Sequence, residues 1–361
     1  MLYYIFFPLR DIWFGFNVFK YITFRAAMAA VFAFLFTLIF GKPIISILKS
    51  MKVGEKIRSG KYFEDLHQRH GGKEGTPTMG GLIILLAVLL STLLWSRVGT
   101  LQVQIIVISS LWLGLIGFID DWIKLKKIGR RGLSGRVKLA GQIILGLGIG
   151  LYLFYNPETG PYAGHLHLPF YKDVAWEIGI FSVLFTILVL VGSTNAVNLT
   201  DGLDGLAIGC LGIAALAYVS GHLQFAQYLQ ILYISGAGEL AVFCSALAGA
   251  ALGFLWFNAY PAEVFMGDTG ALACGGAIGT VAVLIKKELF LALIGGVFVV
   301  EALSVIIQVL GFKMTGRRVF KMAPLHHHFE MKKIPETKIT VRFWICAIIC
   351  ALIGMGALKL Q

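Results

Sequence analysis

Two acidic motifs hold the side chains best suited to chemistry. Asp120 and Asp121 are adjacent carboxylates at the end of a long apolar run, and such neighbours repel each other at a membrane edge unless a cation holds them. A second motif repeats polar residues every three positions, at Asn195, Asn198, Asp201 and Asp204. On a helix these side chains share one face and project into one cavity. Both motifs suit a polar ligand or a hydrated cation.

Two more motifs lie beside apolar runs. Asp268 follows a proline in the segment 258–270, where it is also suited to cap a helix. Lys73 precedes the hydroxyl and glycine residues of 75–81, and this arrangement can receive phosphate at a helix N-terminus. Taken alone, the second motif is better explained as an ordinary helix start.

A run of three histidines, His326 to His328, lies inside a basic segment. Three consecutive histidines cannot all point one way. A zinc site usually needs ligands that are spaced along the chain, and no pair of cysteines accompanies these histidines. Phosphate binding or proton transfer therefore fits the run better than zinc does.

The ligands that these motifs offer are mainly carboxylate and amide oxygens. Such ligands suit Mg²⁺ or Mn²⁺, which bridges a few carboxylates and substrate phosphates. Helix ends, caps and solvated charges explain each motif taken alone. Their combination favours metal-dependent phosphoryl transfer that involves a lipid phosphate.

The elements that must position these motifs are membrane helices. Of the 361 residues, 58% are hydrophobic and 14% are charged, against roughly 25% charged in a soluble domain. A soluble α/β enzyme, a secreted disulfide scaffold and a disordered chain are excluded. The five cysteines lie in apolar runs without a C-x-x-C pair, so neither disulfides nor zinc are expected. We expect one all-α integral membrane domain over residues 1–361.

About ten apolar runs are long enough to be transmembrane helices. They are 22–46, 79–95, 101–119, 137–154, 178–197, 206–220, 240–258, 271–285, 289–311 and 340–360. The sixth is short. In the loop 156–177, the alternating stretch 165–168 predicts a short β-hairpin.

The basic residues set the expected orientation. Of 31 lysines and arginines, 22 lie in the three segments 49–73, 124–138 and 313–342. With ten spans these segments share one side, which the positive-inside rule makes cytoplasmic, and both termini lie outside. The loops after the fifth and seventh spans share that side but carry aspartates instead. The sequence therefore predicts an active-site cleft at the cytoplasmic face.

Together the motifs resemble the polyprenyl-phosphate N-acetylhexosamine-1-phosphate transferase superfamily, from about residue 16 to the C-terminus. The motifs that carry the resemblance are 75–81, Asp120-Asp121, 195–205, 258–270 and 322–328. Within the superfamily the chain is most similar to the bacterial phospho-N-acetylmuramoyl-pentapeptide transferases. Three histidines after Met-Ala-Pro separate that family from relatives with N-acetylglucosamine donors.

The resemblance implies transfer of phospho-N-acetylmuramoyl-pentapeptide from UDP-MurNAc-pentapeptide to undecaprenyl phosphate. The products are lipid I and UMP, in the first membrane step of peptidoglycan synthesis, and the cofactor is Mg²⁺. It also implies a multi-pass homodimer in the bacterial inner (cytoplasmic) membrane, with no nucleic-acid partner.

The resemblance implies roles residue by residue. Asp268 binds Mg²⁺, together with Asp120 and Asp121 where these also reach it. Asp120, Asp121, Asp268 and His326 are the expected catalytic residues. The expected substrate-binding residues are Lys73, Thr78, Lys124, Lys138, Asn195, Asn198, Asp201, Gly202, Leu203, Asp204, Asn258, Phe265, Gln308, His327 and His328.

Several alternatives stay open at this point. An N-acetylglucosamine nucleotide is the alternative donor. A secondary transporter would place its charges near the membrane midplane, and an intramembrane prenyltransferase would show two D-x-x-x-D pairs, which are not found here. Asp120 or Asp121 acts either as a base or as a covalent nucleophile. Glu301, inside the ninth span, is expected to face the bundle interior or the cleft.

Overall fold

The structure is a computed structural model that describes residues 1–51, 75–126, 132–171, 175–228 and 236–360. Its long apolar runs form helices, because a helix satisfies all backbone hydrogen bonds within one segment. In the first half the elements are α1 (Leu2–Phe6), η1 (Phe7–Asp11), η2 (Phe14–Lys20), α2 (Ile22–Ser50), α4 (Gly81–Trp95), α5 (Leu101–Leu125), α6 (Gly135–Tyr155), α7 (Gly160–Ala163), β1 (His165–His167) and β2 (Ala175–Glu177). In the second half they are α8 (Phe181–Thr200), α9 (Leu206–Tyr228), α10 (Ala237–Asn258), α11 (Gly267–Leu284), α12 (Glu288–Ile294), α13 (Gly296–Thr315), α14 (Leu325–Glu330) and α15 (Glu336–Lys359).

Among the described residues, eight helices are long and apolar enough to cross a bilayer, namely α2, α5, α6, α8, α10, α11, α13 and α15. Two shorter apolar helices, α4 and the segment Leu206–Ser220 of α9, occupy the second and sixth predicted spans. The all-α membrane fold is therefore confirmed, whereas the number of helices that cross the bilayer stays a prediction.

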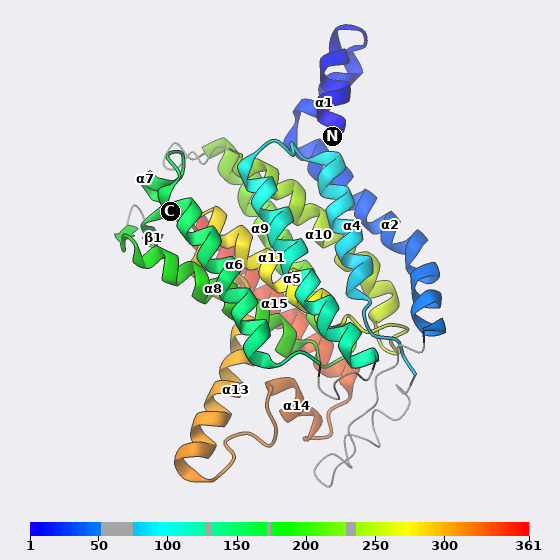
Figure 1. The fold of residues 1–361 in the computed structure, drawn as a ribbon, viewed down its shortest axis with the longest axis vertical. Helices are drawn as coiled ribbons and strands as arrows, with labels where there is room; N and C mark the ends of the chain where they lie inside the picture. Colours follow the sequence, from blue (N-terminus) through cyan, green and yellow to red (C-terminus); the bar gives the residue numbers. More distant parts are fainter. Residues whose placement is uncertain (52–74, 127–131, 172–174, 229–235, 361) are drawn as a thin grey trace.

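The ninth predicted span is not one continuous helix. The structure divides residues 289–311 between α12 and α13, with the break at Gly295. Two glycines in succession, Gly295 and Gly296, give the chain the freedom to break there. In Figure 1, α13 extends below the bundle and leads into α14.

The predicted β-hairpin is confirmed as a small antiparallel pair. β1 and β2 pair with Leu166 opposite Trp176. Leu166 is buried, whereas all of β2 is exposed. β1 therefore packs against the bundle, and β2 is the outer strand.

α10 and α11 form the centre of the bundle and are the most buried of the long helices. α2 and α9 pack on α10, while α5 and α8 pack on α11. Many leucines and isoleucines on the outer helices are exposed, for example Leu184 and Leu188 on α8. The hydrocarbon core of a bilayer solvates such an apolar surface, whereas water does not.

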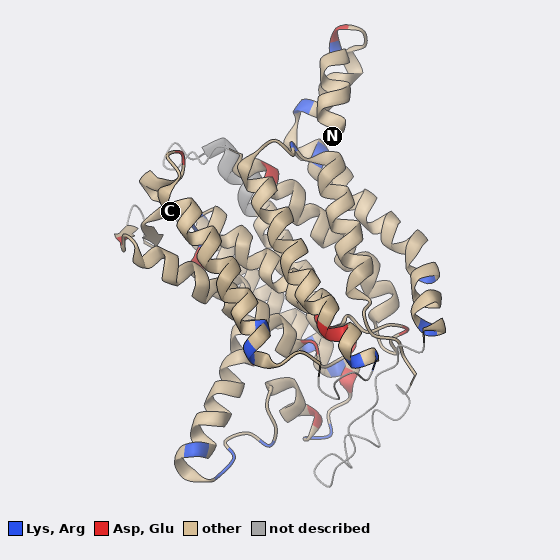
Figure 2. Ribbon diagram, in the orientation of Figure 1, with Lys and Arg blue, Asp and Glu red and all other residues tan. Residues whose placement is uncertain are grey.

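Both chain termini lie toward the end of the bundle opposite α14 (Figure 1). Acidic and basic side chains collect at the α14 end, around the end of α5 (Figure 2). The apolar middle of the bundle thus separates two polar ends.

Candidate active site

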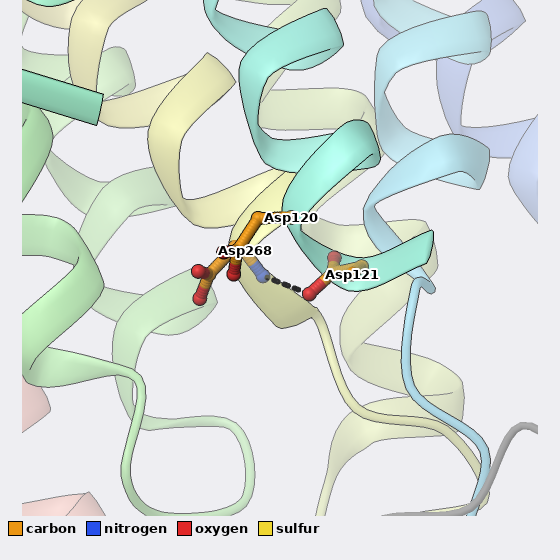
Figure 3. Close-up of side chains that lie close together, drawn as sticks. All are labelled: Asp120, Asp121 and Asp268. Atoms are coloured by element: carbon orange, nitrogen blue, oxygen red, sulfur yellow. Dashed lines mark hydrogen bonds between the residues drawn. The ribbon is translucent and has the colours of Figure 1, made fainter. Parts of the chain in front are cut away.

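Three aspartates converge where α5 ends and α11 begins (Figure 3). Asp120 and Asp121 lie in the last turns of α5, and Asp268 lies in the first turn of α11. One carboxylate oxygen from each lies within 4.8 Å of the others. Asp120 is 0% exposed and Asp121 is 2% exposed, so the cluster is sheltered from solvent.

Two lysines contact this cluster. Lys124, one turn after Asp120 on α5, places its Nζ 2.6 Å from Asp120 Oδ2 and 3.1 Å from Asp268 Oδ2. Lys138, on α6, places its Nζ 2.8 Å from Asp120 Oδ2 and also contacts Asp268. The predicted residues Lys124 and Lys138 thus join the three aspartates in space.

Asp121 fixes the start of α11 beneath the cluster. Its Oδ2 accepts hydrogen bonds from Thr269 N at 2.9 Å and from Thr269 Oγ1 at 2.7 Å, and its Oδ1 accepts one from Asp268 N at 3.3 Å (Figure 3). The first backbone N–H groups of a helix lack partners inside it, and a carboxylate there accepts hydrogen bonds from them. The positive end of the helix dipole also stabilises its negative charge. Asp121 therefore sets the position of Asp268.

Close approach between backbones makes this geometry possible. A Cβ on Gly117 would lie 2.3 Å from the carbonyl oxygen of Asp268, so α5 and α11 touch directly there. Gly267 has φ +70°, and a Cβ on it would lie 2.7 Å from Thr78 Oγ1. Thr78 therefore lies at the edge of the cluster, as part of the segment before α4.

The donor set of this cluster fits a hard divalent cation. Three carboxylates face two ammonium groups, which leaves one excess negative charge among the described side chains. Carboxylate oxygens are the ligands that Mg²⁺ prefers, and Mg²⁺ typically takes one or two of them beside substrate phosphates. Asp268 and Asp120 are suited to hold such an ion, since the carboxylate oxygens of Asp121 already accept hydrogen bonds from the first turn of α11.

The segment before α4 pairs with the segment before α11. Phe265 N donates to Pro77 O at 2.8 Å, and Gly80 N donates to Phe265 O at 2.9 Å. The predicted residues Thr78 and Phe265 therefore lie beside each other along this pair. Lys73 lies outside the described residues.

The period-three motif divides between two environments. Asn195, Asn198 and Asp201 are partly exposed along the end of α8. Asn195 donates to Gln142 Oε1 at 2.7 Å. Gln142 is 1% exposed and was not predicted, although it follows Lys138 by one helical turn on α6. That spacing is the sequence signal that could have identified it.

Leu203, Asp204 and Asn258 are buried within a network of loops. Asp204 Oδ2 accepts from Ala262 N at 3.1 Å, and Asp204 N donates to Glu336 Oε1 at 2.8 Å. Asn258 Oδ1 accepts from Gly205 N at 3.1 Å. These side chains hold the turn 201–205 in place, and Glu336 is a contributor that sequence reasoning missed.

The three histidines point in different directions, as predicted. His327 Nδ1 lies 2.6 Å from Glu330 Oε2, and His328 Nδ1 accepts from Lys321 N at 3.2 Å. Partial burial lowers the pKa of His328, and the neighbouring cations of Lys332 and Lys321 add to this effect.

His326 is 0% exposed and lies between Glu301 and Gly202. Glu301 is also fully buried, which confirms that it faces the bundle interior. Within the described part of the chain, His326 hydrogen-bonds to Glu301 and not to the three aspartates.

Gln308 bonds to both backbone groups of Phe320, on the segment between α13 and α14. It therefore holds this segment against α13.

Comparisons with known proteins identify the family of the chain. The family model Glycosyl transferase family 4 matches residues 103–286, which include all three aspartates. The phospho-N-acetylmuramoyl-pentapeptide-transferase signature 1 matches residues 73–85, the segment that contains Thr78.

Three curated relatives carry the name phospho-N-acetylmuramoyl-pentapeptide-transferase. The relative from Thermodesulfovibrio yellowstonii is 53% identical over 100% of both chains. The relative from Methylacidiphilum infernorum is 51% identical over 96% of both chains, and that from Citrifermentans bemidjiense is 48% identical over 100% of both. This chain, a multi-helix bacterial membrane protein, therefore belongs to the phospho-N-acetylmuramoyl-pentapeptide-transferase family.

Proposed function

We propose that the protein transfers phospho-N-acetylmuramoyl-pentapeptide from UDP-MurNAc-pentapeptide to undecaprenyl phosphate. The observation that carries this proposal is the cluster of Asp120, Asp121 and Asp268 with two lysines, in a chain that belongs to the family so named. The products are lipid I and UMP, and the reaction begins the membrane stage of peptidoglycan synthesis.

The reaction needs one oxygen nucleophile and one leaving group. An oxygen of the lipid phosphate attacks the β-phosphorus of the donor, and the bond from that phosphorus to the bridging oxygen breaks. UMP leaves with the bridging oxygen, and the lipid now carries a diphosphate. Catalysis of such a transfer depends mainly on positioning and on neutralising negative charge.

The residues of the cluster divide this work. Lys124 and Lys138 place two positive charges where the phosphates must approach. We assign the acceptance of a proton from the lipid phosphate to Asp120. It accepts one backbone hydrogen bond, from Leu133 N at 2.6 Å, whereas Asp121 accepts three hydrogen bonds from α11. Asp268 would hold the metal, for which we propose Mg²⁺. When bound, the ion neutralises the donor diphosphate and the departing UMP.

We propose that the other described site residues form a nucleotide and sugar site together with this centre. Phe265 is suited to stack on uracil, next to the hydroxyl of Thr78. Asn195, Asn198 and Asp201 line the end of α8, and His327 and His328 offer ring nitrogens to the donor's phosphates or peptide. The basic segments attract the anionic nucleotide by long-range electrostatics.

A donor competition tests this proposal. The purified protein is given undecaprenyl phosphate, Mg²⁺, and equal amounts of UDP-MurNAc-pentapeptide and UDP-N-acetylglucosamine. We expect formation of lipid I and UMP from the first donor and no turnover after chelation of the metal. Preferential use of UDP-N-acetylglucosamine would instead support the alternative transferase reaction.

We also propose that the protein is a homodimer of the inner membrane, with the aspartate cluster at the cytoplasmic face. The distribution of basic residues supports that orientation. A single cysteine introduced beside the cluster, at Ser134, tests it. It should react with an impermeant maleimide in inverted vesicles and not in intact cells.

A further inference from the structure

Glu301 is a buried carboxylate outside the aspartate cluster. It lies on α13, is 0% exposed, and directs both oxygens at the first turn of α14. Oε2 accepts from Leu325 N at 2.9 Å and lies 3.1 Å from His326 Nδ1, while Oε1 accepts from His326 N at 3.1 Å. A carboxylate in an apolar helix is tolerated only when such donors surround it.

The other side of the His326 ring meets the turn after α8. A Cβ on Gly202 would lie 2.3 Å from His326 Nε2, so only a glycine leaves room for the ring. Nε2 is buried and has no hydrogen-bond partner among the residues that the structure describes. The ring is thus held by Glu301 through one nitrogen and rests against Gly202 with the other.

These contacts connect α13 to the proposed nucleotide site. Gly202 belongs to the turn 201–205, which is otherwise held by Asp204 and Asn258. Because His326 lies behind this turn and is itself fully buried, it supports the turn from within the protein. Loss of that support would let the turn move relative to Phe265.

We infer that Glu301 is a positioning residue that sets the tautomer of His326 and, through the ring, the position of the Gly202 turn. The inference rests on the proposed function, in which this turn binds the uridine end of the donor. An ionised carboxylate accepts the Nδ1–H, so Nε2 carries the lone pair that faces Gly202. A partner of this kind fixes both the orientation and the tautomer of an imidazole ring.

Glu301→Leu tests this inference, because leucine has a similar size and no acceptor. The proton on Nδ1 then loses its acceptor. The ring is free to take the Nε2–H form, which is the more stable tautomer of a neutral histidine side chain in water. We expect ¹⁵N NMR of the histidine rings to show His326 as the Nδ1–H tautomer in the wild type and as the Nε2–H tautomer in the variant. This measurement needs no turnover, and His326→Gln assigns the signal.

The kinetic effect should fall on donor binding. Removing a partner that orients a functional group typically costs about 10–100-fold, and we expect that increase in KM for UDP-MurNAc-pentapeptide, with a smaller change in kcat. Glu301→Asp, which keeps the charge, should recover part of the loss. In the His326→Gln background Glu301→Leu should raise the donor KM by a smaller factor than it does alone, because the contribution through the ring is already lost.

Glu288→Leu is the matched control, since Glu288 is a buried carboxylate paired with Lys286 and lies beyond the far end of α11. It should lower thermal stability and leave the donor KM unchanged. An unchanged tautomer in Glu301→Leu, or equal losses of donor binding in both variants, would overturn the inference. Failure of the wild type to use the donor would contradict the proposed function alone, because the tautomer is measured without it.

Discussion

Buried acids at the two ends of the bundle have different surroundings. At the end opposite the aspartates, Glu239 on α10 accepts from Arg25 Nη1 at 2.6 Å and Nη2 at 2.7 Å, and from Arg97 N at 2.8 Å. Glu288 pairs with Lys286 at 2.7 Å just beyond the end of α11. At the start of α11, three carboxylates share two lysines.

The difference separates structural charges from functional ones. A bidentate pair such as Arg25–Glu239 satisfies its own charges and joins α2 to α10. A cluster with an excess of negative charge is suited to bind a cation, although Asp121 in it also holds the start of α11. The two ends should therefore respond differently to equivalent substitutions.

Asp268→Asn should have the largest effect on activity. Loss of several kcal/mol of charge stabilisation lowers turnover by about 10³-fold or more, at about 1.4 kcal/mol for each factor of ten. Lipid I formation measures the loss, and thermal unfolding checks that the fold persists. Full activity in this variant would remove Asp268 from the metal site.

Arg25→Met should have the largest effect on stability. It leaves Glu239 buried without its main partner, a defect that typically costs about 3–5 kcal/mol. The melting temperature in detergent should fall sharply, while protein that stays folded keeps its kcat. The paired variant Arg25→Met with Glu239→Leu should regain much of the stability. A loss of kcat at unchanged stability would contradict a structural role for this end.

A pair of glycine variants sharpens the comparison. Gly117→Ala places a Cβ 2.3 Å from the carbonyl oxygen of Asp268, and Gly249→Ala places one 2.1 Å from the carbonyl oxygen of Ala30. Each steric conflict should lower the free energy of unfolding by about 1–3 kcal/mol. Only Gly117→Ala displaces the aspartates, so it alone should lower turnover, by about 10–100-fold. Equal turnover in the two variants would show that the cluster tolerates displacement.

The smallest effect is expected at His167 on β1. Partial burial, with help from Lys287, Lys286 and His165, lowers its pKa to about 4. Unfolding restores a pKa of about 6.5, so the cost of protonating the folded protein is absent above that value and grows as the pH falls toward 4. Thermal melts of the wild type and His167→Gln should have the same pH dependence at neutral pH and should diverge in acid, where the wild type loses more stability. Parallel curves would rule out this contribution.

Much of the fold could be predicted, because each membrane helix needs its own long apolar run. The helices α2, α4, α5, α6 and α8 begin and end close to the predicted spans. The break at Gly295 was missed, since apolar residues continue on both sides of it and hydropathy alone cannot separate one helix from two.

The site was predicted in part. Asp120, Asp121 and Asp268 were identified as one cluster through their motifs and the family resemblance, and the structure brings them together. Thr269 and Glu336 were missed as partners, because an isolated threonine or glutamate at the end of a membrane helix has no distinguishing pattern. Gln142 was also missed, although its spacing after Lys138 was a signal. Glu301 was noticed as a buried charge, but its partner was not foreseeable.

The sequence by itself determined that the protein lies in a bilayer, where most of its helices are and which groups are reactive. The length of apolar runs, charge and side-chain chemistry are local properties of the chain. Tertiary structure alone decided which acids share one cation site and which form closed ion pairs. It also decided that His326 rests against Gly202, about 120 residues earlier in the chain. Such distinctions depend on distances between segments far apart in the chain, and close contact between helices sets those distances.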